Sequence, residues 1–108
     1  MREDYGVFGL GDALDSLARD QRAWSEATFG SRGPEGPLRH LKLECDEAIA
    51  TPTPDEFADL LILLLDASWR AGLTPRRLVD AARAKMAVNR ERKWPAPSQD
   101  QPVEHLRD

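Results

Sequence analysis

The sequence predicts an all-α protein, an antiparallel four-helix bundle-like protomer, on the basis of three observations. Apolar residues recur at helical spacing through most of the chain. Clusters of Pro, Gly and Thr divide it into segments of helix length, and no segment alternates convincingly with the period of two typical of a strand. The joints between these segments are short, and short joints favour antiparallel packing of neighbouring helices.

Each of the four expected helices has a start or stop signal of its own. Thr53 followed by Pro54 is typical of an N-cap and a first helical position, and Gly72 is typical of a residue that ends a helix. Pro37 fits the first turn of the second helix, because a missing N–H costs nothing there. The predicted helices run over residues 12–29, about 37–50, 54–71 and 75–93.

One domain is expected over residues 12–94, between a flexible, Gly-rich lead-in at 1–11 and a polar tail at 95–108. A chain of 108 residues suits one domain with one core. The third helix is apolar over most of its circumference, and such a helix is normally buried all round. Because so small a bundle hardly covers it alone, we expect a homodimer or homotetramer with this helix near the interface.

The composition excludes several classes of function. The formal net charge of −4 leaves no general basic surface for a nucleic acid polymer. The single cysteine, Cys45, excludes an internal disulfide and a thiolate-rich zinc site. The first residues lack the pattern of a signal peptide, and the longest apolar run, at 60–65, is too short to span a membrane. We therefore expect a cytoplasmic protein without a membrane partner.

Four carboxylates flank the joint TPTP at residues 51–54. Glu44 and Glu47 share a face of the second helix, and Glu56 and Asp59 share a face of the third. An antiparallel hairpin through the joint brings the two pairs together, where they would repel unless neutralised. A hard divalent cation such as Mg²⁺ neutralises carboxylates directly. The alternative is a stripe of charges that simply faces water, as charged helix faces usually do.

The fourth helix offers matching positive charge. Lys85, Asn89 and Arg92 are spaced i, i+4, i+7 and continue the row of Leu78, Ala81 and Ala82, which we expect to face the core. Polar groups on a core face need partners, and phosphate oxygens beside a cation would supply them. The alternative is that the helix extends past the core, so that these side chains are solvated or pair with the acidic stripe.

Other polar and aromatic residues have two interpretations each. Gln21 lies in an apolar row, where it caps a buried backbone group or reads a base edge or sugar. Trp24 is more typical of a core residue than of a stacking platform, whereas Trp94, at a helix end, is placed to cover a substrate. Cys45 is expected in the core.

The remaining candidates are His40, Asp66 and the tail. His40 fits a helix surface or a contact with phosphate. Asp66 is an exposed acid, a partner of Arg70, or an acceptor for purine N–H groups, and these three alternatives stay open. In the tail, His105 and Arg107 are candidates for contact with a neighbouring subunit's site.

Three segments together resemble a known family: LRHLKLECDE at 38–47, EFADLLILLLD at 56–66 and KMAVNRERKWP at 85–95. They are similar to the MazG-like all-α nucleoside triphosphate pyrophosphohydrolases, and most to the small subgroup that acts on dATP and dGTP and includes phage-encoded enzymes. The resemblance implies Mg²⁺, with Mn²⁺ as a substitute, held by Glu44, Glu47, Glu56 and Asp59. It also implies phosphate or sugar contacts from Lys85, Asn89 and Arg92, and release of a nucleoside monophosphate and pyrophosphate.

We therefore expect metal-assisted hydrolysis of a nucleoside triphosphate, with Glu44 or Glu47 accepting a proton from water. A purine deoxynucleotide is the substrate that the resemblance implies. Two alternatives remain at this level: a non-catalytic helical interaction module, and an enzyme of the same fold acting on dUTP or another pyrimidine nucleotide.

Overall fold

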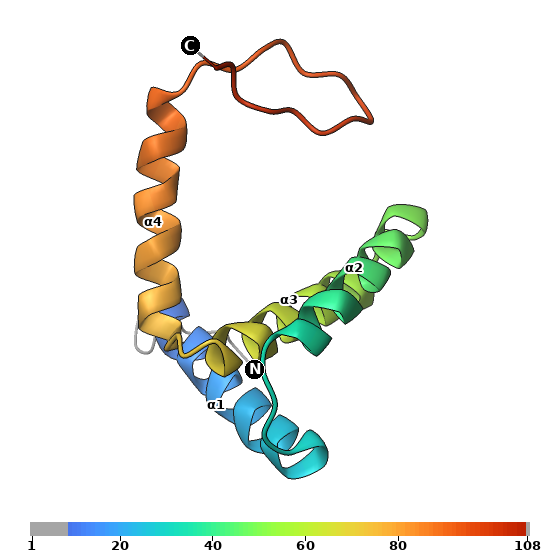
Figure 1. The fold of residues 1–108 in the computed structure, drawn as a ribbon, viewed down its shortest axis with the longest axis vertical. Coiled ribbons are helices and arrows are strands. Elements are labelled where there is room, and N and C mark those ends of the chain that lie inside the picture. The colour runs from blue at the N-terminus through green and yellow to red at the C-terminus, as the bar shows by residue number, and fades with distance from the viewer. Residues whose placement is uncertain (1–8, 108) are drawn as a thin grey trace. The chain divides into compact units, whose positions relative to one another are not determined.

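The structure, a computed structural model, describes residues 9–107, which contain four α-helices and no strand (Figure 1). The helices are α1 (Gly9–Phe29), α2 (Glu35–Ala50), α3 (Pro54–Arg70) and α4 (Pro75–Glu91). The predicted all-α class is therefore confirmed. None of the helices in the described residues is both long and apolar enough to cross a membrane.

The local signals around α3 act as the sequence predicts. The Thr53 side chain accepts a hydrogen bond from the backbone N–H of Glu56 at 3.4 Å, and Pro54 is the first helical residue. Gly72 follows the helix with a φ of +90°, a left-handed conformation that glycine adopts without a steric penalty. Gly30 ends α1 in the same way, with a φ of +74°.

Three helix boundaries differ from the prediction. The first helix starts at Gly9 rather than Asp12, so residues 9–11 of the predicted lead-in are helical, and residues 1–8 lie outside the described part. Glycine is tolerated at a helix start, and Asp12 in the first turn stabilises it through the helix dipole. The α3 helix ends at Arg70 rather than Ala71, and α4 ends at Glu91 rather than Lys93. The α2 helix begins at Glu35, so the buried Pro37 lies in its first turn, as predicted.

The described residues up to Arg76 belong to one compact unit, in which α3 packs against both α1 and α2 (Figure 1). Its buried apolar residues are mostly small: Ala18, Ala48 and Ala67, with Leu65 as the largest. Small side chains let the helices approach closely. The core is therefore narrow, and polar groups occupy much of the remaining buried space.

The apolar third helix is only partly covered within this unit. Burial is confined to residues 65–68, whereas Phe57, Leu61 and Leu64 are 57%, 41% and 42% exposed. These three side chains are spaced i, i+4, i+7 and so lie on one face of α3. An uncovered apolar face is what the oligomer prediction requires, and the oligomer itself stays a prediction.

A second compact unit begins at Arg77 and contains most of α4 and the tail. In it the backbone N–H of Leu106 donates to the carbonyl of Lys93 at 2.6 Å, so the tail folds back on the end of α4. No residue of α4 is buried within the second unit by itself, and the predicted core-facing row of Leu78, Ala81 and Ala82 stays a prediction. The prediction of a single domain over 12–94 stays a prediction.

Candidate active site

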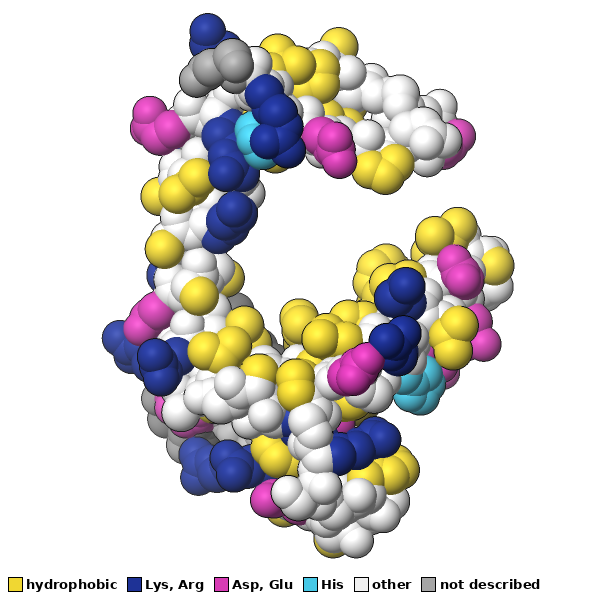
Figure 2. Space-filling view, viewed as in Figure 1, with side chains coloured by type: hydrophobic (Ala, Val, Ile, Leu, Met, Phe, Trp, Pro, Cys, Tyr) yellow, Lys and Arg dark blue, Asp and Glu magenta, His cyan; other side chains and the backbone are white. Residues whose placement is uncertain are grey.

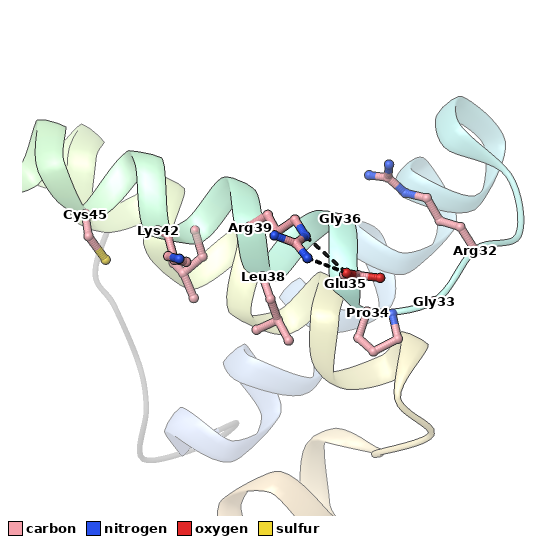
Figure 3. A pocket seen from close by; sticks show the side chains of 10 residues that line it. Arg32, Gly33, Pro34, Glu35, Gly36, Leu38, Arg39, Lys42 and Cys45 are labelled. Atoms are coloured by element: carbon pink, nitrogen blue, oxygen red, sulfur yellow. Dashed lines mark hydrogen bonds and ion pairs between the residues drawn. The ribbon is translucent and has the colours of Figure 1, made fainter.

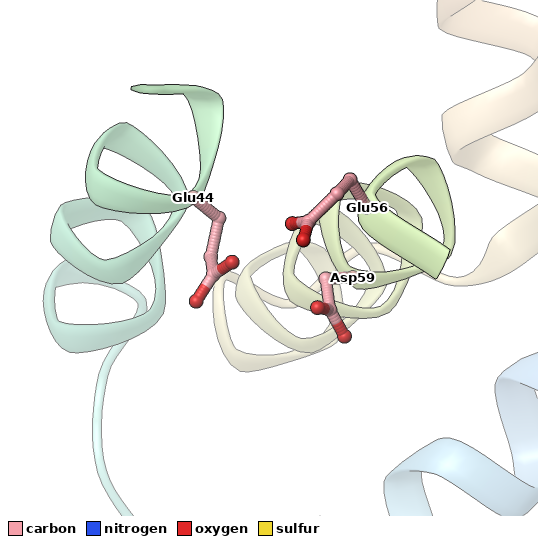
Figure 4. A group of neighbouring side chains, drawn as sticks. All are labelled: Glu44, Glu56 and Asp59. Carbon is pink, nitrogen blue, oxygen red and sulfur yellow. The ribbon is translucent and has the colours of Figure 1, made fainter. Parts of the chain in front are cut away.

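Carboxylates from α2 and α3 converge near the end of the helical hairpin that is closed by the joint between the two helices (Figure 4). Glu44, Glu56 and Asp59 each offer a carboxylate oxygen, and these oxygens all lie within 4.8 Å of one another. The short joint between Ala50 and Pro54 and the packing of α3 on α2 produce this arrangement. Three of the four predicted metal ligands are thus brought together by the fold.

Two oxygens of this acidic cluster (Glu44, Glu56 and Asp59) lack partners. Glu44 Oε2 and Glu56 Oε2 are buried and accept no hydrogen bond from the described residues. The other oxygen of Glu44 lies 3.1 Å from Nε2 of His40, one turn earlier on α2. A buried carboxylate oxygen without a partner is costly. The donor set therefore fits a hard cation, since oxygen ligands at close range are what Mg²⁺ and Mn²⁺ prefer.

Glu47, the fourth predicted ligand, lies beside the cluster rather than within it. Its side chain is exposed, and its pKa is raised above the ordinary value of a glutamic acid. The causes are a hydrogen bond with Glu44, the charge of Glu44, and then the charges of Glu56 and Asp59. The concentration of negative charge around Glu47 favours the uptake of a proton. The same charge would favour the binding of a cation.

A cavity of about 300 Å³ opens beside the acidic cluster, entirely within the first unit. Six of the residues predicted from the sequence line it: Gln21, Trp24, His40, Glu44, Asp59 and Asp66. Ile62 and Leu63 also line it, which explains why apolar residues interrupt the acidic stripe of α3. The cavity therefore joins a carboxylate end to an end lined by aromatic, amide and apolar groups.

Gln21 and Asp66 are hydrogen-bonded to each other inside the protein. Gln21 Nε2 donates to Asp66 Oδ1 at 2.8 Å, and Gln21 Oε1 accepts from the indole of Trp69 at 2.9 Å. Asp66 Oδ2 accepts from Nε of Arg70 at 2.9 Å. Of the three alternatives for Asp66, the partner of Arg70 is correct and the exposed acid is wrong. Gln21 is buried as expected, but its partners are side chains rather than backbone.

Asp66 is ionised in this environment. Burial raises the pKa of its carboxyl, but hydrogen bonds from Ser25, Gln21 and Arg70, together with the positive charge of Arg70, outweigh it. The net pKa lies below the ordinary value of 3.8. Asp66 is only 4% exposed, so this end of the cavity presents a fixed negative charge that has its own counter-ion.

The prediction that Trp24 belongs to the core is wrong. Its side chain is 58% exposed and meets the ring of Phe29 edge-on, with the ring centres 5.5 Å apart. Both rings line the cavity. Phe29, Ser25 and Arg32 were missed as lining residues, because they lie at the end of α1 and in the following loop, where helical periodicity gives no signal.

The predicted phosphate-binding residues lie in the second unit. Lys85 is exposed, and Asn89 and Arg92 are half-buried. Arg92 Nη1 donates to Asn89 Oδ1 at 3.4 Å, and the Trp94 indole donates to the carbonyl of Asn89 at 2.8 Å. Asn89, Arg92 and Trp94 are therefore connected at the end of α4.

The tail adds His105 to this group. Its ring meets that of Trp94 edge-on at 5.9 Å. The pKa of His105 is lowered by burial and by the positive charges of Arg92, Arg107 and Lys85. Lys, Arg and His side chains are gathered at this end of α4 (Figure 2). The end of α4 and the folded-back tail thus form one concentration of positive charge.

A second depression, of about 970 Å³, runs along α2 (Figure 3). Leu38, Leu41 and Cys45 supply its apolar wall, and an ion pair of Arg39 with Glu35 lies at one end. Cys45 is therefore exposed, and its predicted place in the core is wrong. Arg32 lines both this depression and the smaller cavity.

Known proteins resemble this chain over most of its length. Residues 17–108 match the model of the dATP/dGTP pyrophosphohydrolase family. The Eaa protein of Salmonella phage P22 is 39% identical over 95 residues, an alignment that covers 87% of this chain and only 30% of that protein. The dATP/dGTP diphosphohydrolase of cyanophage S-2L is 39% identical over 81 residues, covering 72% of this chain and 74% of that protein.

A solved structure shares the fold. It is described as the cyanophage S-2L MazG-like pyrophosphohydrolase bound to dGDP and three catalytic Mn²⁺ ions per active site. The TM-score is 0.72 at 33% sequence identity, with 88% of this chain and 94% of that chain covered. With the family model matching from the middle of α1 to the C-terminal residue, the chain belongs to the dATP/dGTP pyrophosphohydrolase family and has a MazG-like all-α fold.

Proposed function

We propose that this chain hydrolyses dATP or dGTP to the deoxynucleoside monophosphate and pyrophosphate in a reaction that requires Mg²⁺. The observation that carries the proposal is the acidic cluster, in which two buried carboxylate oxygens lack partners next to a cavity. The relatives support the substrate class, since one is a dATP/dGTP diphosphohydrolase and a similar structure holds dGDP with Mn²⁺.

Glu44, Glu56 and Asp59 would hold the cation, with Glu47 at its edge. When bound, Mg²⁺ or Mn²⁺ supplies positive charge that neutralises the polyphosphate and lowers the pKa of a coordinated water. The protein keeps the three carboxylates in place by packing α2 against α3, so they need little reorganisation when the cation arrives. His40 orients Glu44 through the contact between Nε2 and Oε1.

Glu47 is the residue we assign as the proton acceptor. Glu47 is exposed and contributes no oxygen to the acidic cluster, so its carboxylate can accept a proton from the attacking water. Glu44 was the equal candidate from the sequence. The fold favours Glu47, because Glu44 Oε1 is already engaged with His40 and Oε2 is buried.

The cavity would take the nucleoside. Trp24 and Phe29 offer aromatic faces on which a base stacks, and Asp66 offers an ionised acceptor to N–H groups of the base. Lys85, Asn89, Arg92 and Trp94 would contact the phosphates or sugar, with Arg92 as a fork and Lys85 as a point charge. The positive charge at the end of α4 supports that role.

A homodimer or homotetramer is part of this proposal. The exposed row of Phe57, Leu61 and Leu64 supports it, because apolar faces of this kind mark interfaces. Light scattering coupled to gel filtration measures the mass directly. A Leu61→Glu variant should reduce that mass, and an unchanged multiple of 12.1 kDa would place the interface elsewhere.

A panel of all common ribonucleoside and deoxyribonucleoside triphosphates, assayed for pyrophosphate release with Mg²⁺ and with Mn²⁺, tests the activity. We expect dATP and dGTP to have the highest kcat/KM. A preference for dUTP or another pyrimidine nucleotide would be consistent with the proposed enzyme class but would refute the proposed purine substrate. No turnover and no metal-dependent nucleotide binding would instead point to a non-catalytic helical module.

Two variants test the site assignment. Glu44→Gln and Asp59→Asn should abolish turnover while the far-UV circular dichroism spectrum stays that of the wild type. Asp55→Asn is the matched control, since Asp55 lies one turn before Asp59 on α3 and is not part of the acidic cluster. If both cluster variants keep full turnover, the carboxylates do not hold the catalytic metal.

A further inference from the structure

We propose that Arg32 binds the phosphate chain of the nucleotide and that Arg70 positions Arg32, an inference that rests on the proposed function. The two residues lie on different segments, Arg32 in the loop before α2 and Arg70 at the last position of α3. Neither Arg32 nor Arg70 lies in the three motifs that resemble the family. The assignment follows from how the loop is held and from what lines the cavity.

Arg32 is the one Lys or Arg side chain among the described residues that line the cavity of about 300 Å³. The other lining groups with a formal charge are carboxylates, Glu44, Asp59 and Asp66, together with the titratable His40. A polyphosphate that enters this cavity meets three negative side chains. A guanidinium in the same wall offsets that repulsion without requiring a residue from the second unit, and it forks onto phosphate oxygens.

The guanidinium of Arg32 lies close to two parts of the first unit, although the residue is exposed. Its central carbon lies 5.2 Å from the centre of the Phe29 ring, a cation–π distance, and Phe29 lines the same cavity. The guanidinium also lies near the first turn of α2 (Figure 3). A Cβ at Gly36 would lie only 3.1 Å from Nη1 of Arg32, so the absence of a side chain at Gly36 leaves room for it.

Arg70 fixes the backbone of this loop. Its side chain is fully buried, and Nη1 donates to the carbonyl of Gly30 at 3.0 Å and to that of Arg32 at 3.2 Å. Nη2 donates to Ser25 Oγ at 2.8 Å, and Nε is held by Asp66. One guanidinium thus ties the end of α1 and the loop to α3. A lysine has the charge but not the fork to make these contacts.

The first experiment measures nucleotide affinity by calorimetry on the full chain with Mg²⁺, using a non-hydrolysable α,β-methylene dGTP and, separately, deoxyguanosine. Arg32→Ala should weaken the triphosphate analogue between about 10- and 100-fold, the size of lost charge-assisted hydrogen bonds, and leave deoxyguanosine unchanged. Arg39→Ala is the matched control, because Arg39 is exposed, pairs with Glu35 and does not line the cavity.

Two results would overturn the assignment of Arg32. Equal affinity of wild type and Arg32→Ala for the triphosphate analogue would show that no contact exists. An equal loss for deoxyguanosine would place the contact on the base or sugar. If the wild-type chain binds the analogue in an Arg32-dependent way but hydrolyses no deoxynucleotide, the proposed function fails and the inference stands.

A double-mutant cycle tests the positioning by Arg70. Arg70→Lys should raise the Kd for the triphosphate analogue in the wild-type background and have no further effect in the Arg32→Ala background, while Mg²⁺ affinity stays unchanged. Because Arg70→Lys risks misfolding, Ser25→Ala repeats the cycle with only one of the Arg70 contacts removed. A purely structural role would lower stability and leave Kd unchanged, and additive losses of affinity would also refute the positioning.

Discussion

Two regions of α3 carry carboxylates with opposite electrostatic situations. In its first two turns, Glu56 and Asp59 meet Glu44 of α2, and all three side chains of this acidic cluster are carboxylates. Seven residues after Asp59, Asp66 is bonded by Gln21 and by Arg70. The residue type is nearly the same, and the two positions share one face of the helix. What differs is the source of the positive charge.

The comparison separates an acid whose counter-ion is part of the fold from acids for which we propose a bound cation as the counter-ion. Asp66 has its counter-ion inside the chain, so its pKa is lowered and its role is fixed when the protein folds. The acidic cluster has two buried oxygens without partners, and the pKa of the adjacent Glu47 is raised. Buried carboxylate oxygens without partners at one site, in contrast to a fully paired carboxylate at the other, support the proposal that the first site receives a cation.

The largest expected effect comes from removing the internal counter-ion. Arg70→Ala should destabilise the fold by about 3–5 kcal/mol, because it leaves Asp66 charged and buried without a partner. Urea unfolding followed by circular dichroism measures the loss. The control is Arg39→Ala, which breaks an exposed i,i+4 pair with Glu35; although that pair is shorter, at 2.6 Å against 2.9 Å, we expect a loss below about 0.5 kcal/mol. Equal losses of stability in the two variants would show that the buried pair of Asp66 with Arg70 contributes no more than the exposed pair of Glu35 with Arg39.

Neutralising the acidic cluster should act on activity rather than on folding. Glu56→Gln removes a metal ligand, so we expect kcat/KM to fall by roughly 100-fold or more, at or beyond the effect of losing an outer-shell partner. Without metal, the same variant should be at least as stable as the wild type, because a negative charge leaves a crowded group. A Glu56→Gln protein that is active but less stable than the wild type would show that Glu56 acts in folding rather than in metal binding.

The effect of Mg²⁺ on thermal stability tests whether the cation binds at the acidic cluster. At an Mg²⁺ concentration 100 times its Kd, a single site that is absent from the unfolded chain stabilises the wild type by about 2.7 kcal/mol. Differential scanning fluorimetry should show a rise in Tm that Glu56→Gln abolishes and that Arg39→Ala retains. A rise of equal size in all three proteins would mean that the cation binds somewhere else.

The parts of the fold that sequence predicted are those set by neighbouring residues. Thr53 and Pro54 start α3 through a local cap, and Gly72 ends it through its backbone conformation. The meeting of Glu44 with Glu56 and Asp59 was also predictable, because a three-residue joint favours antiparallel packing of two successive helices. The start of α1 was not, since Gly9 and Gly11 resemble loop signals.

The parts that sequence missed depend on contacts between distant residues. Gln21 and Asp66 are 45 positions apart, and nothing in either helical pattern says that they bond. Arg70 was recognised as a neighbour of Asp66 on one helix, but its bonds to Gly30 and Arg32 required the fold. Trp24 was misplaced for a related reason: a tryptophan in an apolar row is typical of a core, and only the structure shows a cavity beside it.

The smallest expected effect is a difference in how stability depends on acid. Asp66 has a folded-state pKa below 3.8, so its ionisation contributes stability that is fully present near neutral pH. That contribution is lost as the pH falls from the ordinary value of 3.8 through the lower folded-state pKa, where Asp66 takes up a proton. The measurement is urea unfolding of wild type and Asp66→Asn at successive pH values down from 6, with exposed Asp46→Asn as the charge-matched control. The wild type should be the more stable at pH 6, and the gap should narrow below pH 4 for Asp66→Asn alone. A gap that stays constant with pH would mean that Asp66 titrates identically in the folded and unfolded chains, and the contrast with the acidic cluster would then rest on packing rather than on charge.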